Sequence, residues 1–193
     1  MDSEIIDLPE AELLYFPHFF FETKADAYFE KLLSDIEWRQ EKIRLFGKEV
    51  LQPRLTALYA NNNKTYTYSG LTLQPENFSE ELLQIKTAVE KVCTVNFSTC
   101  LLNLYRSGQD SMGWHADDEK ELGVNPEIAS VSFGVERIFH FKHKTENQKH
   151  KLILKHGSLL IMRGSTQHFW KHQLPKSRKD IGSRINLTFR KII

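Results

Sequence analysis

The segment 113–119 carries a histidine and a carboxylate at a spacing that suits metal binding. His115 and Asp117 are separated by one residue, so in an extended chain both side chains point to the same face. Two histidines and one carboxylate on one face of a metal leave three coordination positions open, an arrangement diagnostic of non-haem Fe(II) oxygenases. A His-x-Asp pair alone is equally explained by a histidine hydrogen-bonded to a nearby aspartate at a turn.

The third ligand of such a triad would come from a later strand. His172 lies 55 residues beyond Asp117, and His156 and His168 compete with it. His168 and His172 are four residues apart, so in a strand they would face the same side. Spacing therefore leaves the third ligand open.

The expected strand 184–190 could bind an anion. Its alternation of polar and apolar residues places four polar side chains on one face: Arg184, Asn186, Thr188 and Arg190. Asn103 and Tyr105 form a similar pair flanked by leucines. Inward-facing arginines need a compensating anion, and a guanidinium pairs best with a carboxylate, so a small dicarboxylate would match two of them. The alternative is the solvated outer face of an edge strand.

These side chains must be positioned by a mainly β arrangement with two helices. Helical spacing predicts helices over 23–36 and from 77–79 to about 92. In the first, Thr23 and Asp26 resemble a capping box, and the apolar residues fall on one face: Tyr28, Phe29, Leu32, Leu33 and Ile36. Short strands are expected over 55–59, 65–68, 97–105, 127–133, 136–143, 150–155, 158–163, 168–174 and 184–190. So many short strands favour a sandwich or barrel.

Composition narrows the class of protein. The 193 residues are 40% hydrophobic and include two cysteines, too few for a disulfide scaffold or a four-cysteine zinc site. No secretory signal and no apolar stretch long enough for a membrane span is found, so we expect an intracellular protein, cytoplasmic or, in a eukaryote, nuclear, without a membrane partner. The acidic first dozen residues are expected to form a loosely held arm.

The formal charge of +1 hides an asymmetry. Residues 140–193 hold 13 of the 26 lysines and arginines but only two of the 25 acidic residues, Glu146 and Asp180. A basic half can be the electrostatic footprint of a polyanion site. A solvated lysine-rich face is the simpler explanation of the same charges.

Four strings together resemble the AlkB family of Fe(II)- and 2-oxoglutarate-dependent nucleic-acid dealkylases. They are Asn103-Leu-Tyr105, His115-Ala-Asp117, His172 and Arg184-Ile-Asn186-Leu-Thr188-Phe-Arg190, in the family's order. The phrases at 66–73 and 128–134 resemble the family's double-strand DNA repair subgroup. The similarity covers the chain from about residue 40 to its end.

The resemblance implies an α+β, mainly β fold: a double-stranded β-helix (jelly roll) core with N-terminal helices and a nucleotide-recognition lid. It implies one AlkB-like dioxygenase domain over 1–193, divided into an arm and first strand (1–22), helices and lid (23–95) and a jelly-roll catalytic core (96–193). His115, Asp117 and His172 become the catalytic iron ligands, because the family's distal histidine stands twelve residues before the first arginine of the closing strand. The 2-oxoglutarate-binding residues become Asn103, Tyr105, Arg184, Asn186, Thr188 and Arg190.

The same resemblance implies how substrate is bound. A hairpin containing Phe46, Gly47 and Lys48 would wedge an apolar side chain into the duplex where a damaged base has left the stack. Tyr66, Thr67 and Tyr68 match the segment that stacks on the flipped base, and Asp118 and Glu119 lie where the family places carboxylates near it. A core-facing Phe46 and a solvated acidic turn are the alternatives.

The implied activity is oxidative demethylation of N-alkylated bases, of the 1-methyladenine and 3-methylcytosine type, in DNA and favouring duplex. Fe(II) would be the cofactor, 2-oxoglutarate and O2 the cosubstrates and formaldehyde the released product. Alkylated DNA is the expected partner, with RNA possible, no protein partner evident and a monomer expected. The rival hypotheses are a 2-oxoglutarate oxygenase acting on RNA or another substrate, and a non-catalytic nucleic-acid binder.

Overall fold

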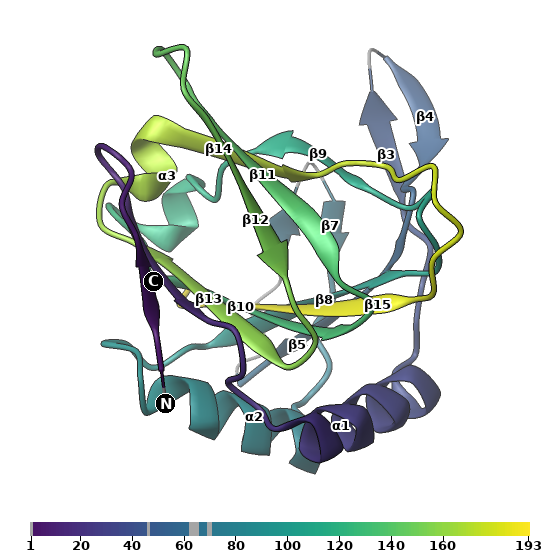
Figure 1. The fold of residues 1–193 in the computed structure, drawn as a ribbon. Helices are drawn as coiled ribbons and strands as arrows, with labels where there is room; N and C mark the ends of the chain where they lie inside the picture. The colour runs from purple at the N-terminus through teal and green to yellow at the C-terminus, as the bar shows by residue number, and fades with distance from the viewer. Residues whose placement is uncertain (1, 46, 62–65, 69–70) are drawn as a thin grey trace.

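Two antiparallel sheets packed face to face form the centre of the computed structural model (Figure 1), which describes residues 2–45, 47–61, 66–68 and 71–193. Within those residues the large sheet has seven strands, in the order β1 (Glu4–Ile6), β2 (Glu12–Phe16), β13 (Ser158–Arg163), β10 (Ile128–Gly134), β15 (Arg184–Arg190), β8 (Thr99–Tyr105) and β5 (Leu55–Ala60). The small sheet has four, in the order β12 (Lys149–Leu154), β11 (Arg137–His143), β14 (Trp170–Leu174) and β9 (Met112–His115). The expected mainly β, α+β class is confirmed, and the facing antiparallel sheets agree with a jelly roll.

The helices and the remaining strands lie around this sandwich. Helices α1 (Glu22–Asp35) and α2 (Glu80–Glu90) cover the outer face of the large sheet (Figure 1). Two hairpins form separate two-stranded sheets: β3 (Lys42–Leu45) pairs with β4 (Lys48–Leu51), and β6 (Tyr66–Tyr68) pairs with β7 (Leu71–Leu73). A short helix α3 (Thr166–Phe169) joins β13 to β14, and the 3-10 turn η1 (Lys120–Leu122) follows β9. No helix in the described part of the chain is long and apolar enough to cross a membrane.

Alternation along the central strands decides which side chains meet the helices. On β15, Ile185, Leu187 and Phe189 belong to the core that faces α1 and α2. Strands β8 and β10 send their own alternate apolar residues into that core. Period two then directs the remaining residues of β8, β10 and β15, most of them polar, into the space between the two sheets. One face of the large sheet therefore packs in the hydrophobic core, and the other carries mostly polar side chains into the space between the two sheets.

The two long helices begin differently. The α2 helix starts after Ser79, within the range 77–79 that the sequence predicts. The Ser79 hydroxyl caps it by accepting a hydrogen bond from the Leu82 amide at 3.3 Å. The prediction of a capping box formed by Thr23 and Asp26 is wrong, because α1 already begins at Glu22 and no side chain caps it. Leu33 is 40% exposed, so it does not share the buried face of α1, which Ala25, Tyr28 and Leu32 form.

The loosely held arm expected over the acidic first dozen residues is instead ordered. Strands β1 and β2 form a hairpin, and β2 pairs along its length with β13 at the edge of the large sheet. The turn of this hairpin is fastened to the small sheet: the Trp170 indole donates to the Pro9 carbonyl at 2.9 Å, and Glu10 contacts the His143 ring at 3.0 Å. The expectation rested on the number of acidic residues and overlooked the alternation of Leu13 and Tyr15, which are both buried.

The expected strand 168–174 begins two residues later than predicted. Residues 166–169 form α3, and only 170–174 are extended. His168 is exposed on α3, whereas His172 is 3% exposed. The expectation that both histidines face the same side is therefore wrong, because a helical turn separates them.

We predict that Gly157→Ala lowers the free energy of unfolding by about 1–3 kcal/mol. Gly157 has φ +70°, and a Cβ there would lie 2.6 Å from the Phe20 carbonyl oxygen, which is backbone. The matched control is Gly182→Ala, where a Cβ meets nothing within 4 Å. Urea unfolding measures both variants, and equal stabilities would contradict the prediction.

Candidate active site

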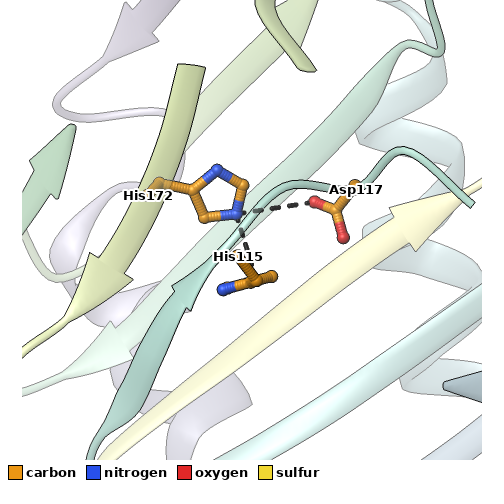
Figure 2. Close-up of side chains that lie close together, drawn as sticks. All are labelled: His115, Asp117 and His172. Carbon is orange, nitrogen blue, oxygen red and sulfur yellow. Dashed lines mark hydrogen bonds and ion pairs between the residues drawn. The ribbon is translucent and has the colours of Figure 1, made fainter. Parts of the chain in front are cut away.

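Three side chains with metal-binding atoms converge between the two sheets (Figure 2). His115 is the last residue of β9, Asp117 follows it in the connecting segment, and His172 lies directly opposite His115 on β14. The His172 Nε2 lies 3.1 Å from the His115 Nε2 and 3.6 Å from an Asp117 carboxylate oxygen. Within the described residues this is the cluster of histidine, cysteine or carboxylate groups close enough to hold a metal ion, with ligand atoms all within 4.8 Å of one another.

Burial and charge leave these ligands in the protonation states that a cation needs. Burial and, to a smaller extent, the neighbouring His115 lower the pKa of His172 to about 3, against the opposing effect of Asp117. Burial also lowers the pKa of His115. Burial alone would raise the pKa of Asp117, but Arg190 and the two imidazoles outweigh it and bring that pKa to about 2. The site therefore offers two neutral imidazoles and one carboxylate at neutral pH.

Neighbouring groups fix the direction of each ligand. The His115 Nδ1 lies 2.9 Å from the Gly113 carbonyl, which makes Nδ1 the protonated nitrogen and turns the Nε2 lone pair to the centre. The His172 ring packs against Phe139, with ring centroids 5.2 Å apart. One Asp117 oxygen accepts from Arg190 at 2.6 and 3.2 Å, so the other carboxylate oxygen faces His172.

The residues predicted to hold a dicarboxylate line the same cavity as the triad. They are Asn103, Tyr105, Arg184, Asn186, Thr188 and Arg190. Strand pairing brings them together, because Arg184 lies opposite Tyr105 and Asn186 lies opposite Asn103 in the register of β15 with β8. The solvated edge strand is therefore excluded: β15 lies between β10 and β8 in the middle of the large sheet.

Arg184 is a buried cation at the far end of this cavity. Its side chain is 2% exposed, its guanidinium lies 5.4 Å from the centre of the Tyr105 ring, and one nitrogen donates to Ser132 at 2.9 Å. Burial lowers its pKa to about 10, against the opposing effect of Tyr105. Its Nε has no hydrogen-bond partner, and none of the described carboxylates forms an ion pair with it. A buried guanidinium in this state fits a carboxylate ligand.

Three residues that hold the side chains of the cavity were not predicted from the sequence, and one of them, Ser130, also lines it. Ser130 accepts from the Asn186 amide at 2.8 Å and Ser132 accepts from Arg184. Their alternation with Ala129, Val131 and Phe133 was the signal that could have found them. Arg54, 4% exposed, donates to the Asn103 amide oxygen at 2.8 Å, and nothing in its sequence surroundings marks it.

The residues predicted to contact substrate are described only in part. Phe46 lies outside the described residues, while Gly47, with φ +77°, stands at the turn of the hairpin β3–β4 and Lys48 is the first residue of β4. Tyr66, Thr67 and Tyr68 form strand β6, of which the backbone is described. Of the hairpin residues whose side chains the structure describes, 42–43 and 47–51, none lines the cavity that holds the triad.

The two carboxylates after Asp117 differ in their surroundings. Asp118 is exposed and its carboxylate contacts the Lys144 ammonium at 2.9 Å. Glu119 is half-buried, with one carboxylate oxygen lacking a hydrogen-bond partner. Burial raises the pKa of Glu119, and the nearby Asp117 raises it further. Glu119 is thus the carboxylate of the two that lies within the electrostatic reach of the triad.

Comparison with known proteins decides the family. The family model described as the 2OG-Fe(II) oxygenase superfamily matches residues 12–190. The chain belongs to this superfamily. The residues of this oxygenase fit the iron(II) and 2-oxoglutarate of its superfamily. Two neutral histidines and a carboxylate suit the metal, and Arg184, which pairs with none of the described carboxylates, suits the cosubstrate.

Curated relatives place this oxygenase in the AlkB family. It is 40% identical over 185 residues to the DNA oxidative demethylase ALKBH2 of Homo sapiens, covering 90% of this chain and 71% of the relative. The Bos taurus ALKBH2 is 40% identical over 90% of this chain, and the Bos taurus alpha-ketoglutarate-dependent dioxygenase alkB homolog 3 is 41% identical over 88%. The chain spans 66% and 62% of the lengths of these two bovine relatives.

A solved structure supports the fold independently of sequence. The structure of OsALKBH1 matches this oxygenase with a TM-score of 0.67, covering 97% of this chain and 100% of that chain. The two sequences are 17% identical, so the match concerns the fold alone. It agrees with the two facing sheets described above.

We predict that Mn²⁺ binding at pH 6.5 releases far less than one proton. Two histidines of ordinary pKa, each half protonated at this pH, would together release about one proton. The lowered pKa values of His115 and His172 mean that both are already neutral. Calorimetry in two buffers of different ionisation enthalpy measures the release. Glu119→Gln is the control, because the raised pKa of Glu119 makes it another group near the triad that could release a proton. Release of about one proton in this variant would contradict the prediction.

Proposed function

We propose that this oxygenase oxidatively demethylates N-alkylated bases in DNA, of the 1-methyladenine and 3-methylcytosine type, with Fe(II), 2-oxoglutarate and O2, releasing formaldehyde. The observation that carries the proposal is the meeting of the triad and the anion-free Arg184 in one cavity. It is supported by 40% identity to proteins named DNA oxidative demethylase. We further propose one dioxygenase domain over 1–193, with a nucleotide-recognition lid within 23–95.

In this proposal His115, Asp117 and His172 hold the iron, and six cavity residues hold 2-oxoglutarate: Asn103, Tyr105, Arg184, Asn186, Thr188 and Arg190. When bound, the iron and 2-oxoglutarate together supply the activation of O2 that oxidises the methyl group. Arg184 would pair with the carboxylate far from the metal, since it lies beside Tyr105 at the other end of the cavity. Arg190 would stay on Asp117 and contribute positive charge to the cavity at the end nearer the triad.

The chain's own share is to orient the reactants and exclude water. The triad lies between the sheets, with His172 and Asp117 3% and 1% exposed. Phe139, Met162 and Leu174 supply apolar surface around it. An enclosed cavity with fixed donors strengthens each electrostatic contact and prevents side reactions.

We propose that the alkylated base is flipped out of the strand and held by the residues that the family resemblance assigns to substrate. Phe46, with Gly47 and Lys48, would fill the gap in a duplex, and Tyr66, Thr67 and Tyr68 would stack on the base. Glu119, and Asp118 once released from Lys144, would attract a base that methylation has made cationic. Flipping costs least where methylation has already broken the base pair, so damage is favoured.

A basic face on the small sheet supports a nucleic-acid substrate. Lys142 on β11 lies directly opposite Lys149 on β12 and Lys171 on β14. All three are exposed, and no ion pair reaches them from the described residues. Like charges directly opposite one another destabilise a sheet, so a row of three lysines indicates an anionic partner such as a phosphate backbone.

We predict that the purified protein repairs 1-methyladenine in oligonucleotides only when Fe(II), 2-oxoglutarate and O2 are all present. His115→Ala should abolish both repair and succinate formation, because it removes one of the three ligands. Phe46→Ala should reduce repair of duplex more than of single strands. Mass spectrometry of the oligonucleotide and succinate assay provide the measurements.

Three results would count against this proposal. Succinate without base repair would keep the oxygenase and discard the DNA substrate, with methylated RNA tested next. Neither product, in protein that contains iron, would favour a non-catalytic binder. Equal losses on duplex and single strands in Phe46→Ala would remove the wedge.

We also predict that Lys142→Gln weakens DNA binding and reduces the slope of log affinity against log salt by about 1, the value for one phosphate contact. Stability should not fall, because the substitution relieves repulsion from Lys149 and Lys171. Lys91→Gln, at the end of α2 on the helix side, is the matched control. Fluorescence anisotropy over a salt series measures both, and equal slopes would exclude Lys142 from the interface.

A further inference from the structure

A buried glutamine outside the triad is bonded to the main chain of the triad's carboxylate. The Gln167 side chain is 1% exposed, and its Oε1 accepts the backbone N–H of Asp117 at 2.9 Å. Its amide nitrogen faces the Met162 sulfur at 3.6 Å. Because a thioether is a weak acceptor and the N–H needs an oxygen, these two partners fix which way the carboxamide points.

The Asp117 amide needs this partner because of where the strand ends. Strand β9 stops at His115, and residues 116–119 run outside both sheets. Asp117 is nevertheless buried, so its N–H has neither a sheet neighbour nor water. An unpaired buried N–H is costly, and Gln167 removes that cost while fixing the backbone from which the carboxylate extends.

The helix that carries Gln167 is itself firmly held. Helix α3 lies where the chain crosses from the large sheet, at β13, to the small sheet, at β14. The Thr166 hydroxyl donates to the Arg163 carbonyl at 2.6 Å and accepts from the Glu12 N–H at 2.9 Å. The N-terminal hairpin therefore anchors α3 from outside the site.

A lysine joins the same two segments a second time. The Lys144 ammonium contacts the Gln167 carbonyl at 3.0 Å and the Asp118 carboxylate at 2.9 Å. The segment 117–118 is thus tied to α3 at two successive residues. His172 lies on the strand that starts directly after α3, so Gln167 links the carboxylate ligand to the strand of the distal histidine.

We propose that Gln167 is a positioning residue for the metal centre: its carboxamide oxygen holds the Asp117 backbone so that the carboxylate meets the two histidines. This inference rests on the proposed triad and adds to it a residue that touches neither metal nor substrate. Groups that orient metal ligands in this way typically change metal affinity by about 10–100-fold when they are replaced.

The test compares two substitutions that differ in the acceptor oxygen. Gln167→Met keeps the length of the side chain and removes the oxygen, and we expect Mn²⁺ affinity to fall by about 10-fold or more. Gln167→Glu keeps an acceptor and adds negative charge near the cation site, so it should not lose affinity. Gln173→Met is the matched control, since Gln173 is next to His172 in sequence but its side chain faces His140 on the other side of β14.

Mn²⁺ affinity is measured by calorimetry on the folded, metal-free proteins, with Tm recorded in parallel and the visible absorption of the anaerobic Fe(II)–2-oxoglutarate complex as a second readout. A lower Tm with unchanged affinity in Gln167→Met would overturn the proposal, as would equal losses in the Met and Glu variants. If Gln167→Met does not fold, the shorter Gln167→Asn takes its place. Lower Mn²⁺ affinity in Gln167→Asn but not in Gln167→Glu would then support the same role. Mn²⁺ binding that survives His115→Ala would instead refute the triad, and with it the proposed function.

Discussion

The carboxylate of Asp117 is the charge around which the centre of the protein is arranged. It is 1% exposed, and a buried carboxylate is unfavourable unless cations or hydrogen-bond donors surround it. Arg190, from the last strand, supplies the permanent cation, and the imidazoles of His115 and His172 lie on its other side. Strand β15, the small sheet and the segment after β9 therefore meet at the Asp117 carboxylate. A bound divalent cation would add to this balance rather than create it.

In this arrangement Arg190 has two roles and Arg184 has one. Arg190 neutralises Asp117 and also lines the cavity, so its charge is shared before any cosubstrate arrives. Arg184 has no such partner among the described carboxylates and keeps its charge for a ligand. The two ends of the cavity thus differ in electrostatic character, one balanced and one positive. An asymmetric dicarboxylate such as 2-oxoglutarate would have a preferred orientation in it.

The sequence was most informative where side-chain period and strand geometry agree. Alternation along 184–190 predicted that four polar residues share one face, because a strand shows its two faces directly in its sequence. The pairing of β15 with β10 and β8 then decided that this face points inward. Spacing could not choose between His168 and His172, since the helical turn of α3 that separates them is too short to give a periodic signal. Gln167 and Arg54 were missed for another reason. Each acts through one contact with a residue distant in the chain, and such contacts leave no local pattern.

The position of β15 has a consequence for the order in which the protein assembles. This strand follows all the others in the chain, yet it lies between β10 and β8 in the middle of the large sheet. Until it is inserted, the sheet consists of two separate halves with unpaired edges, and such long-range closure is a slow step in folding. The same strand brings Arg184 and Arg190. A chain without β15 therefore lacks Arg190, the cation that pairs with Asp117 in the folded protein, and the cavity is complete only when the sheet has closed.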